Sequence, residues 1–277
     1  MIGKLRRLLN SFNRFASNVD VMTRAVDDLV TVSRFVDQNS RLVTQTLSSG
    51  AVSDLKPREN QTELMVRHRG MWMPLGESRF QNWMSETGDY QQEQYEMGLK
   101  HTQRRGVAVD VGANVGFFSK HLCRDFETVH AFEPVHPTRA CLARNVPERN
   151  LIIYPYALSD SIGEPEIKYS RLACGGAQIG GTLPSGIGPE MLTQRVRLMM
   201  LDDLGIPSID FLKLDVQGLE VQVLKGAEKT LARSKCTILC EVEVNGTRSD
   251  GAEEWLVSRG YTVAGRFKKD VVFVPAP

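Results

Sequence analysis

The first part of the chain carries an apolar residue at every third or fourth position. This spacing continues over residues 1–47, with Ser33 and Ser40 as interruptions and no proline. A long and narrow apolar seam of this kind is typical of a coiled coil, so it predicts self-association into a homo-oligomer. Two alternatives stay open: an amphipathic helix that packs on the rest of the chain, and a basic amphipathic segment that touches a membrane surface.

Residues 48–101 follow a different pattern. After a polar linker, short apolar runs lie on either side of Arg69 and Gly70, which predicts a hairpin. Helical patterns come next, near residues 79–85 and 90–101. We therefore interpret this part as a linker, a hairpin and a helical lead-in to the domain that follows.

Residues 102–277 alternate short β-branched apolar runs with helical patterns. These patterns predict strands at about 107–111, 128–132, 151–156, 209–215, 236–243, 261–266 and 270–275, and helices at about 115–125, 136–145, 218–233 and 250–259. The alternation predicts an α/β domain with a mainly parallel sheet covered on both faces, and the last two strands predict a C-terminal antiparallel hairpin. The glycine-rich stretch 161–200 breaks the alternation, so we expect a mobile ligand-binding loop there.

Composition and charge narrow the class of protein. The chain is 42% hydrophobic and 24% charged, as in ordinary soluble proteins. Lys and Arg total 34 against 33 for Asp and Glu, so there is no basic footprint for a nucleic acid. No apolar run reaches about 18 residues, so no membrane span is expected. The 5 cysteines form no Cys-x-x-Cys pair, which predicts reduced thiols in a cytoplasmic protein and no zinc site.

The most informative stretch is a strand, a glycine-spaced turn and the start of a helix over residues 107–119. The candidate ligand-binding residues in it are Asp110, Gly112, Ala113, Asn114 and Gly116. The spacing Asp-x-Gly-x-x-x-Gly is neither a dinucleotide-binding loop nor a phosphate-binding loop, and it contains no lysine. A carboxylate at the mouth of this turn would repel pyrophosphate and suits an ammonium group. The turn therefore predicts a zwitterionic ligand without a phosphate.

A second candidate follows the next strand. Glu133 ends the run Val-His-Ala-Phe-Glu over residues 129–133. A carboxylate at this place in a nucleotide-binding α/β unit accepts hydrogen bonds from both hydroxyls of a ribose. Glu133 is thus the predicted ribose-binding residue.

These two segments resemble the first two motifs of class I S-adenosylmethionine (SAM) methyltransferases. Further motifs, in order along the chain, are similar to those of the FkbM family: Ala-Leu-Ser-Asp at 157–160, Leu-Asp-Asp-Leu at 201–204, Phe-Leu-Lys-Leu-Asp-Val-Gln-Gly-Leu-Glu at 211–220 and Val-Leu-Lys-Gly-Ala at 223–227. The similarity covers roughly residues 105–245. It implies a Rossmann-like class I methyltransferase fold and SAM as the cofactor. It also implies O-methylation of a small-molecule or glycan-like acceptor at a hydroxyl. The glycine-rich stretch 161–200 is then the candidate loop for binding this acceptor.

The resemblance also assigns individual residues. It implies that Ala157 and Asp160 line the adenine pocket. It places Asn114 beside the methionine part of SAM, although an Asn at this point also suits a turn with left-handed φ.

Asp215 is the predicted catalytic residue. It stands at the C-terminal end of the fourth strand, where open α/β sheets bind ligands, and it is a candidate general base or acceptor orienter. The alternative is a cap for the helix that begins near Gly218. Family members usually have Asp-Val-Glu-Gly here, whereas this chain has Gln217 in place of the Glu. Gln cannot take up a proton or bind a metal strongly, so any contact it makes is a hydrogen bond.

Three charged residues near this strand are weaker candidates. Lys213 lies inside an apolar strand and is expected to pair with a carboxylate. Glu241 and Glu243 follow the fifth strand and form an acidic pocket with Asp215 if the fold brings them together, but no metal is assigned to them. Two other functions stay open: N-methylation of a small molecule or protein, and a catalytically silent SAM-binding or assembly protein.

Overall fold

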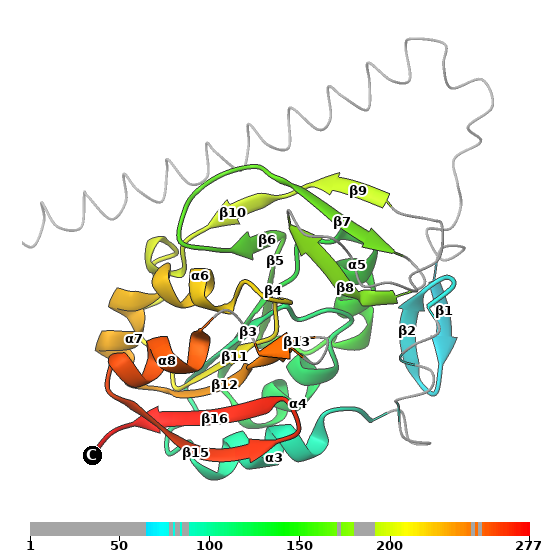
Figure 1. The fold of residues 1–277 in the computed structure, drawn as a ribbon. Coiled ribbons are helices and arrows are strands. Elements are labelled where there is room, and N and C mark those ends of the chain that lie inside the picture. The colour runs from blue at the N-terminus through cyan, green and yellow to red at the C-terminus, as the bar shows by residue number, and fades with distance from the viewer. Residues whose placement is uncertain are drawn as a thin grey trace, which may run out of the picture. The chain divides into compact units, whose positions relative to one another are not determined.

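A computed structural model describes residues 65–77, 80, 84, 89–170, 173–179, 192–244, 247–248 and 251–277 (Figure 1). These residues belong to one compact unit, Gln61–Pro277. The coiled coil predicted over residues 1–47 lies outside the described residues. So does most of the helix predicted near 79–85, of which only Phe80 and Met84 are described. No helix within the described ranges is long and apolar enough to cross a membrane.

A seven-stranded sheet with the strand order β15-β16-β12-β11-β3-β4-β5 forms the centre of this unit. Its strands are β3 (Val107–Val111), β4 (Thr128–Phe132), β5 (Leu151–Tyr154), β11 (Phe211–Leu214), β12 (Thr237–Glu241), β15 (Tyr261–Phe267) and β16 (Asp270–Pro275). The strands from β12 to β5 run parallel, whereas β16 is antiparallel to both β12 and β15. The predicted mainly parallel sheet with a C-terminal hairpin is thus confirmed.

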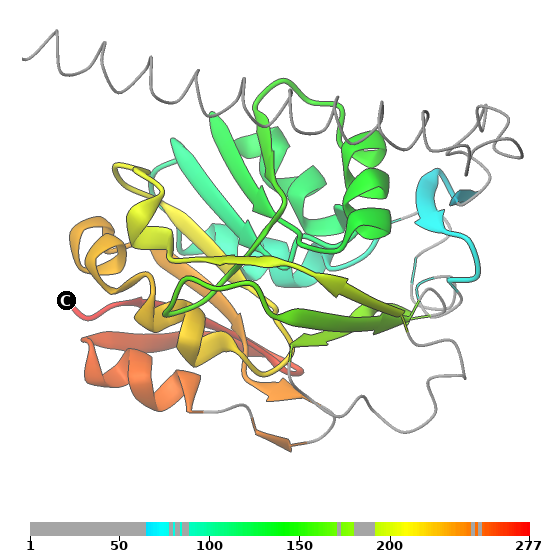
Figure 2. The ribbon, with the colours of Figure 1, turned by 90° about the horizontal axis from the view of Figure 1, so that it is seen from above.

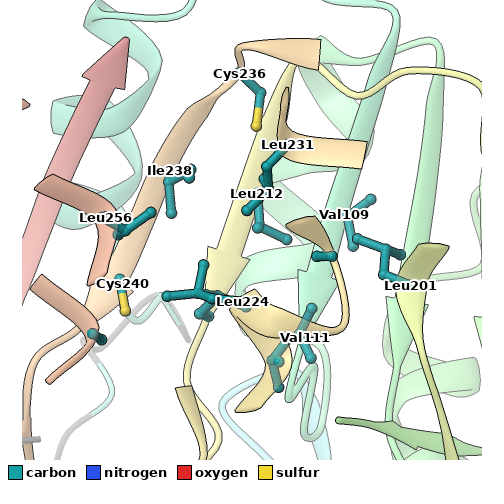
Figure 3. Packing of buried hydrophobic residues seen from close by; sticks show 14 of the residues in the cluster. Val109, Val111, Leu201, Leu212, Leu224, Leu231, Cys236, Ile238, Cys240 and Leu256 are labelled. Carbon is teal, nitrogen blue, oxygen red and sulfur yellow. The ribbon is translucent and has the colours of Figure 1, made fainter. Parts of the chain in front are cut away.

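Helices cover both faces of the sheet (Figure 2). Alternate residues of each strand point to opposite sides, so the apolar side chains on each face need a layer of helices to bury them. One layer consists of α6 (Glu220–Lys225), α7 (Glu228–Ser234) and α8 (Ala252–Ser258), and the other of α3 (Gln92–Lys100), α4 (Phe117–Asp125) and α5 (His136–Asn145). Val109 and Val111 face the first layer, where they join the cluster of Leu224 and Leu231 shown in Figure 3. Ala108 faces the second layer. Strands buried on both faces explain their nearly continuous apolar sequences.

The stretch between β5 and β11 corrects the prediction of a loop over residues 161–200. Its described part contains β6 (Tyr156–Leu158), β7 (Glu166–Ser170), β8 (Ala173–Ile179), β9 (Leu192–Arg195), β10 (Arg197–Met199) and the 3-10 helix η2 (Leu201–Asp203). The strands β8, β7 and β9 form an antiparallel sheet, and β6 pairs with β10 in parallel. Ile167 and Tyr169 alternate with exposed residues and pack on Val135 and Val196. This buried face, hidden among glycines in the sequence, makes the stretch a second small sheet.

The predicted hairpin before the domain is present as β1 (Met65–His68) and β2 (Met71–Pro74). Asn145 at the end of α5 fixes it: the Trp72 amide donates to Asn145 Oδ1 at 2.6 Å, and Asn145 Nδ2 donates to the carbonyls of Trp72 at 2.8 Å and Val115 at 2.7 Å. The hairpin β1–β2 is therefore tied to the turn that precedes α4. Elsewhere in the domain, a short antiparallel pair, β13 (Glu243–Val244) and β14 (Thr247–Arg248), follows β12.

Three of the sequence motifs meet at one structural junction. Asp202 accepts hydrogen bonds from the backbone N–H groups of Lys229 at 3.0 Å and Thr230 at 2.7 Å, in the first turn of α7. A Cβ on Gly226 would lie 1.9 Å from the carbonyl oxygen of Ser159. Only glycine fits at this close approach. Together with the hydrogen bonds to Asp202, it brings residues 157–160, 201–204 and 223–227 into contact, and these contacts are structural.

Candidate functional site

A cavity lies at the edge of the sheet where the parallel strands end. The ends of β3, β4, β11 and β12 bring Gly112, Glu133, Asp215 and Glu241 to this cavity. The carboxyl ends of parallel strands share one edge, which is where open α/β sheets bind ligands. Residues from outside the central sheet, among them Phe80, Tyr90, Cys174 and Lys269, complete the lining. The structure thus gathers most of the predicted site residues in one place.

The turn after β3 lines the cavity with Gly112, Ala113 and Asn114. The N–H groups of Gly112 and Ala113 both donate to the Phe132 carbonyl at 3.0 Å, which ties the turn to the end of β4. Gly112 has a φ of 79°, and a Cβ there would lie 2.0 Å from the Asp215 carbonyl oxygen. This position therefore requires glycine both for its backbone angle and for the close approach of β11.

The side chain of Asn114 supports the turn from within. Its φ is 52°, and its Oδ1 accepts the N–H of Val115 at 2.8 Å, which is the turn role that the sequence left open. The same oxygen lies 3.4 Å from Cys174 Sγ on β8. The N–H of Cys174 in turn donates to the buried Glu77 at 2.6 Å. The small sheet and the segment after β2 are thus connected to the turn.

Two predicted ligand residues of this turn, Asp110 and Gly116, make contacts with other parts of the domain. Asp110 is fully buried; its Oδ2 accepts the Ser119 hydroxyl at 2.6 Å, and its Oδ1 lies 3.5 Å from Lys213 Nζ. A Cβ on Gly116 would lie 2.6 Å from Leu142 Cδ1, so this glycine permits α4 to pack on α5. Neither residue is among those that line the cavity.

Glu133 is buried at the end of β4 and lines the cavity. Its Oε2 accepts the N–H of Asn114 at 3.0 Å, and its Oε1 accepts the N–H of Val135 at 2.8 Å. Burial raises the pKa of this carboxyl to about 7, although the two backbone N–H groups oppose the shift. Each oxygen has a second lone pair, so Glu133 can bind a diol while it holds the turn.

The two residues predicted to lie near an adenine are placed differently. Ala157 on β6 lines the cavity, together with Pro134, Tyr156 and Leu158. Asp160 is exposed and accepts the Ser159 hydroxyl at 3.3 Å. It is not among the residues that line the cavity. The residues around Ala157 therefore form a largely apolar wall of the cavity, and Asp160 is not part of this wall.

Asp215 follows β11 directly and lines the cavity. Its Oδ1 accepts the Gln217 amide at 2.9 Å, and its Oδ2 lies 3.7 Å from Lys213 Nζ. The helix-cap alternative is wrong, because α6 begins at Glu220 with Leu219 as its N-cap, and this helix start has no side-chain cap hydrogen bond. Glu220 instead accepts the N–H groups of Val216 and Gly218, at 3.1 Å and 3.0 Å. The side chain of Asp215 thus stays at the cavity.

The expected partner of Lys213 is confirmed. Lys213 lies opposite Asp110 in the β11–β3 register, and its ammonium group lies between Asp110 and Asp215. Burial lowers the pKa of Lys213, but the surrounding carboxylates outweigh burial and raise it. The same ammonium group holds the pKa of Asp215 well below its usual range against the effect of burial, with help from Gln217. Asp215 is therefore ionised and charge-compensated.

Phe80 and Lys269 reach the cavity from distant segments and escaped the sequence reasoning. Phe80, Tyr90 and Phe117 form an aromatic group, with ring centroids 5.3 to 5.6 Å apart. Lys269 reaches the cavity from the β15–β16 turn and forms an ion pair with Glu241. No group of His, Cys, Asp and Glu within the described ranges has the arrangement of a metal site. All 5 cysteines are buried and free of disulfides.

The fold and the cavity define a Rossmann-like methyltransferase domain. A family model, the Methyltransferase FkbM domain, matches residues 110–263. The match covers more than half of the chain, so the chain belongs to the FkbM methyltransferase family, whose methyl donor is S-adenosylmethionine. The predicted cofactor is thus confirmed at the level of the family.

Individual proteins that match this chain have low sequence identity to it. The chain is 29% identical over 204 residues to the AMB antimetabolite synthetase AmbE of Pseudomonas aeruginosa, which covers 58% of this chain and only 10% of that protein. The structure of Methyltransferase FkbM from Methylobacillus flagellatus KT is 17% identical, with a TM-score of 0.44, 62% of this chain and 44% of that chain covered. A proposed tRNA (m1A22) methyltransferase of Streptococcus pneumoniae in complex with SAM is 13% identical, with a TM-score of 0.40 and coverage of 66% and 72%.

The residues around the cavity fit SAM. Glu133 offers a carboxylate with spare lone pairs for a ribose diol. Lys213 lines the cavity and offers an ammonium group for the carboxylate of an amino acid. Pro134, Ala157 and Leu158 add an apolar wall. These groups match the three chemical parts of the donor.

Proposed function

We propose that this chain is a SAM-dependent O-methyltransferase that modifies a hydroxyl of a sugar or glycan-like acceptor. One observation carries the proposal: the β3–α4 turn, Glu133 and Asp215 line the same cavity. A donor held by the turn and an acceptor held by Asp215 would therefore meet in one place.

The donor side is built from Gly112, Ala113, Asn114 and Glu133, with Ala157 at its apolar end. Glu133 holds the turn through Asn114 and would bind the ribose with its remaining lone pairs. Asp110 would contribute indirectly, because its carboxylate fixes Lys213 beside the cavity. The bound donor supplies a methyl group that is already activated by a positively charged sulfur, so the chain chiefly has to align the reacting groups.

The acceptor side is centred on Asp215. Lys213 and the Gln217 amide hold its pKa well below the usual range, and a carboxylate with a low pKa is a weak base. Asp215 would therefore accept a hydrogen bond from the acceptor hydroxyl and orient its oxygen, more than remove its proton. The aromatic group of Phe80, Tyr90 and Phe117 would offer a flat apolar surface beside it.

The first test is calorimetric titration of the purified chain with SAM, S-adenosylhomocysteine and NAD. We expect saturable binding of the two sulfur ligands and none of NAD. Glycans and, as a comparison, amines are then screened as acceptors by mass spectrometry. Methylation of amines alone would replace the proposal by N-methylation. Donor binding without any turnover would favour a SAM-binding or assembly protein.

Asp215→Asn tests the acceptor side. Asparagine keeps the size of the side chain but loses its charge, so we expect turnover to fall roughly 10²-fold through misplacement of the acceptor. Donor affinity should stay within about threefold. The control is Asp203→Asn, since Asp203 is exposed and lies outside the residues that line the cavity. Full turnover in Asp215→Asn would remove Asp215 from the mechanism.

A further inference from the structure

Glu241 and Asp215 occupy neighbouring positions at the end of two adjacent parallel strands. Leu214 lies opposite Cys240 in the β11–β12 register, so the next residue of each strand brings these two carboxyl groups side by side. The side chain of Glu241 is only 1% exposed, and both residues line the cavity. Two carboxyl groups this close in a buried site do not both ionise, because their charges repel at low dielectric.

The groups around the pair decide where the proton lies. The ionisable side chains that face it are Lys213 on β11, Lys269 and Asp270 on the β15–β16 hairpin, Asp110 on β3 and Tyr90 before α3. Asp215 has Lys213 and the Gln217 amide as partners for its charge. Glu241 has Lys269 on Oε1, whereas its Oε2 is buried and has no hydrogen-bond partner among the described residues.

We propose that Glu241 is a positioning residue of the acceptor site, which carries the shared proton and donates it in a hydrogen bond to the ionised Asp215. Lys269 holds the other oxygen of Glu241 and so fixes the direction of this hydrogen bond. The role of Glu241 in turnover rests on the proposed function, whereas the location of the proton does not. Electrostatics agree with the geometry: burial and the neighbouring Asp215 raise the pKa of Glu241 to about 10.

The location of the proton is measured without donor or acceptor. Carboxyl ¹³C resonances of the full chain, labelled at Glu and Asp, are followed from pH 5 to pH 9, and the Glu241 resonance is assigned by its loss in Glu241→Gln. We expect this resonance to keep the chemical shift of a protonated carboxyl throughout. The chemical shift of an ionised carboxylate throughout this range, as the ordinary glutamate pKa of about 4.3 would give, would overturn the proposal.

Lys269→Met provides a second variant that leaves Glu241 in place. Lys269 favours the ionised form of Glu241, so its removal should move the titration of Glu241 to still higher pH. Both proteins are compared from about pH 8 to pH 11, where this titration is expected. A shift toward lower pH, or none, would contradict the contact between these two side chains. Because the side chain of Lys269 is 47% exposed, this variant is also the less disruptive one for folding.

The positioning role is tested by turnover of the acceptor found in the screen. Glutamine imitates a protonated glutamate, so Glu241→Gln should keep turnover within about threefold, whereas Glu241→Ala should lose roughly 10²-fold because Asp215 is no longer held. Equal losses in the two variants, with donor affinity unchanged, would overturn the positioning role. If the wild-type chain methylates no acceptor, the proposed function and this role in turnover both fail, and the resonance of Glu241 still decides where the proton lies.

Discussion

Gly112 is the position at which the donor turn and the end of β11 come closest. Its φ is 79°, and a Cβ would lie 2.0 Å from the Asp215 carbonyl oxygen. Gly260, between α8 and β15, has a φ of 81°, but nothing lies within 4 Å of its Cβ position. Gly112→Ala and Gly260→Ala are therefore a matched pair, in which only Gly112→Ala adds a clash with backbone to the strain of a positive φ.

The expected magnitudes follow from these two terms. An alanine in the left-handed region costs roughly 1–2 kcal/mol, and Gly260→Ala should reduce the free energy of unfolding by that amount. A methyl group forced into a filled site costs about 1–3 kcal/mol more, so Gly112→Ala should lose about 2–5 kcal/mol in total. For a domain of this size each kcal/mol lowers Tm by about 2–4 °C.

SAM affinity should distinguish Gly112→Ala from Gly260→Ala more clearly than the free energy of unfolding does. The backbone of Asp215 has to move away from Gly112 to admit the methyl group, which displaces both the donor turn and the acceptor side. We expect Gly112→Ala to bind SAM at least tenfold more weakly by calorimetry, and Gly260→Ala to bind it normally. Equal losses of Tm in the two variants, together with unchanged SAM affinity in Gly112→Ala, would refute the reasoning, because the strands would then separate without cost.

Two more predictions concern Glu133 and the N-terminal segment. The ionised Glu133 is the better acceptor for ribose hydroxyls and its pKa is about 7, so SAM affinity should fall as pH decreases from about 8 to 6, and calorimetry should find no such dependence in Glu133→Gln. Since the folded state keeps a proton that the unfolded state has lost, the contribution of Glu133 to stability should decrease as pH rises from 4.5 to about 7. Deletion of residues 1–47 should leave a folded monomer by light scattering, and an unchanged oligomer would contradict the predicted coiled coil.

The central sheet could be predicted almost completely from the sequence, because its inner strands β3, β4, β11 and β12 are largely buried on both faces and read as nearly continuous apolar runs. The helix predicted over residues 218–233 is different, since the structure divides it into α6 and α7. The division falls at Gly226, whose missing Cβ admits the Ser159 carbonyl. Such a contact between segments more than 60 residues apart leaves no periodic signal, so local pattern alone predicts one helix.

The site shows the same distinction between local and distant information. Gly112, Asn114 and Glu133 reach the cavity because a strand end and a tight turn dictate where they lie. The direction of the Asp110 side chain depends instead on Lys213, which comes from another strand and meets it only through the β11–β3 register. Phe80 likewise reaches the cavity from before the domain. Residue types and their spacing along the chain do not predict these contacts between distant segments.

The order of charges along the sheet edge explains why Asp215, and not Asp110, faces the cavity. Asp110, Lys213, Asp215, Glu241 and Lys269 follow one another across β3, β11, β12 and the β15–β16 turn. A buried charge is tolerated when an opposite charge or a hydrogen bond compensates it, and in this row each carboxyl group has a lysine beside it. Lys213 lies between Asp110 and Asp215, and of these two carboxylates only Asp215 is among the residues that line the cavity, so the negative charge beside Lys213 at the cavity comes from the end of β11.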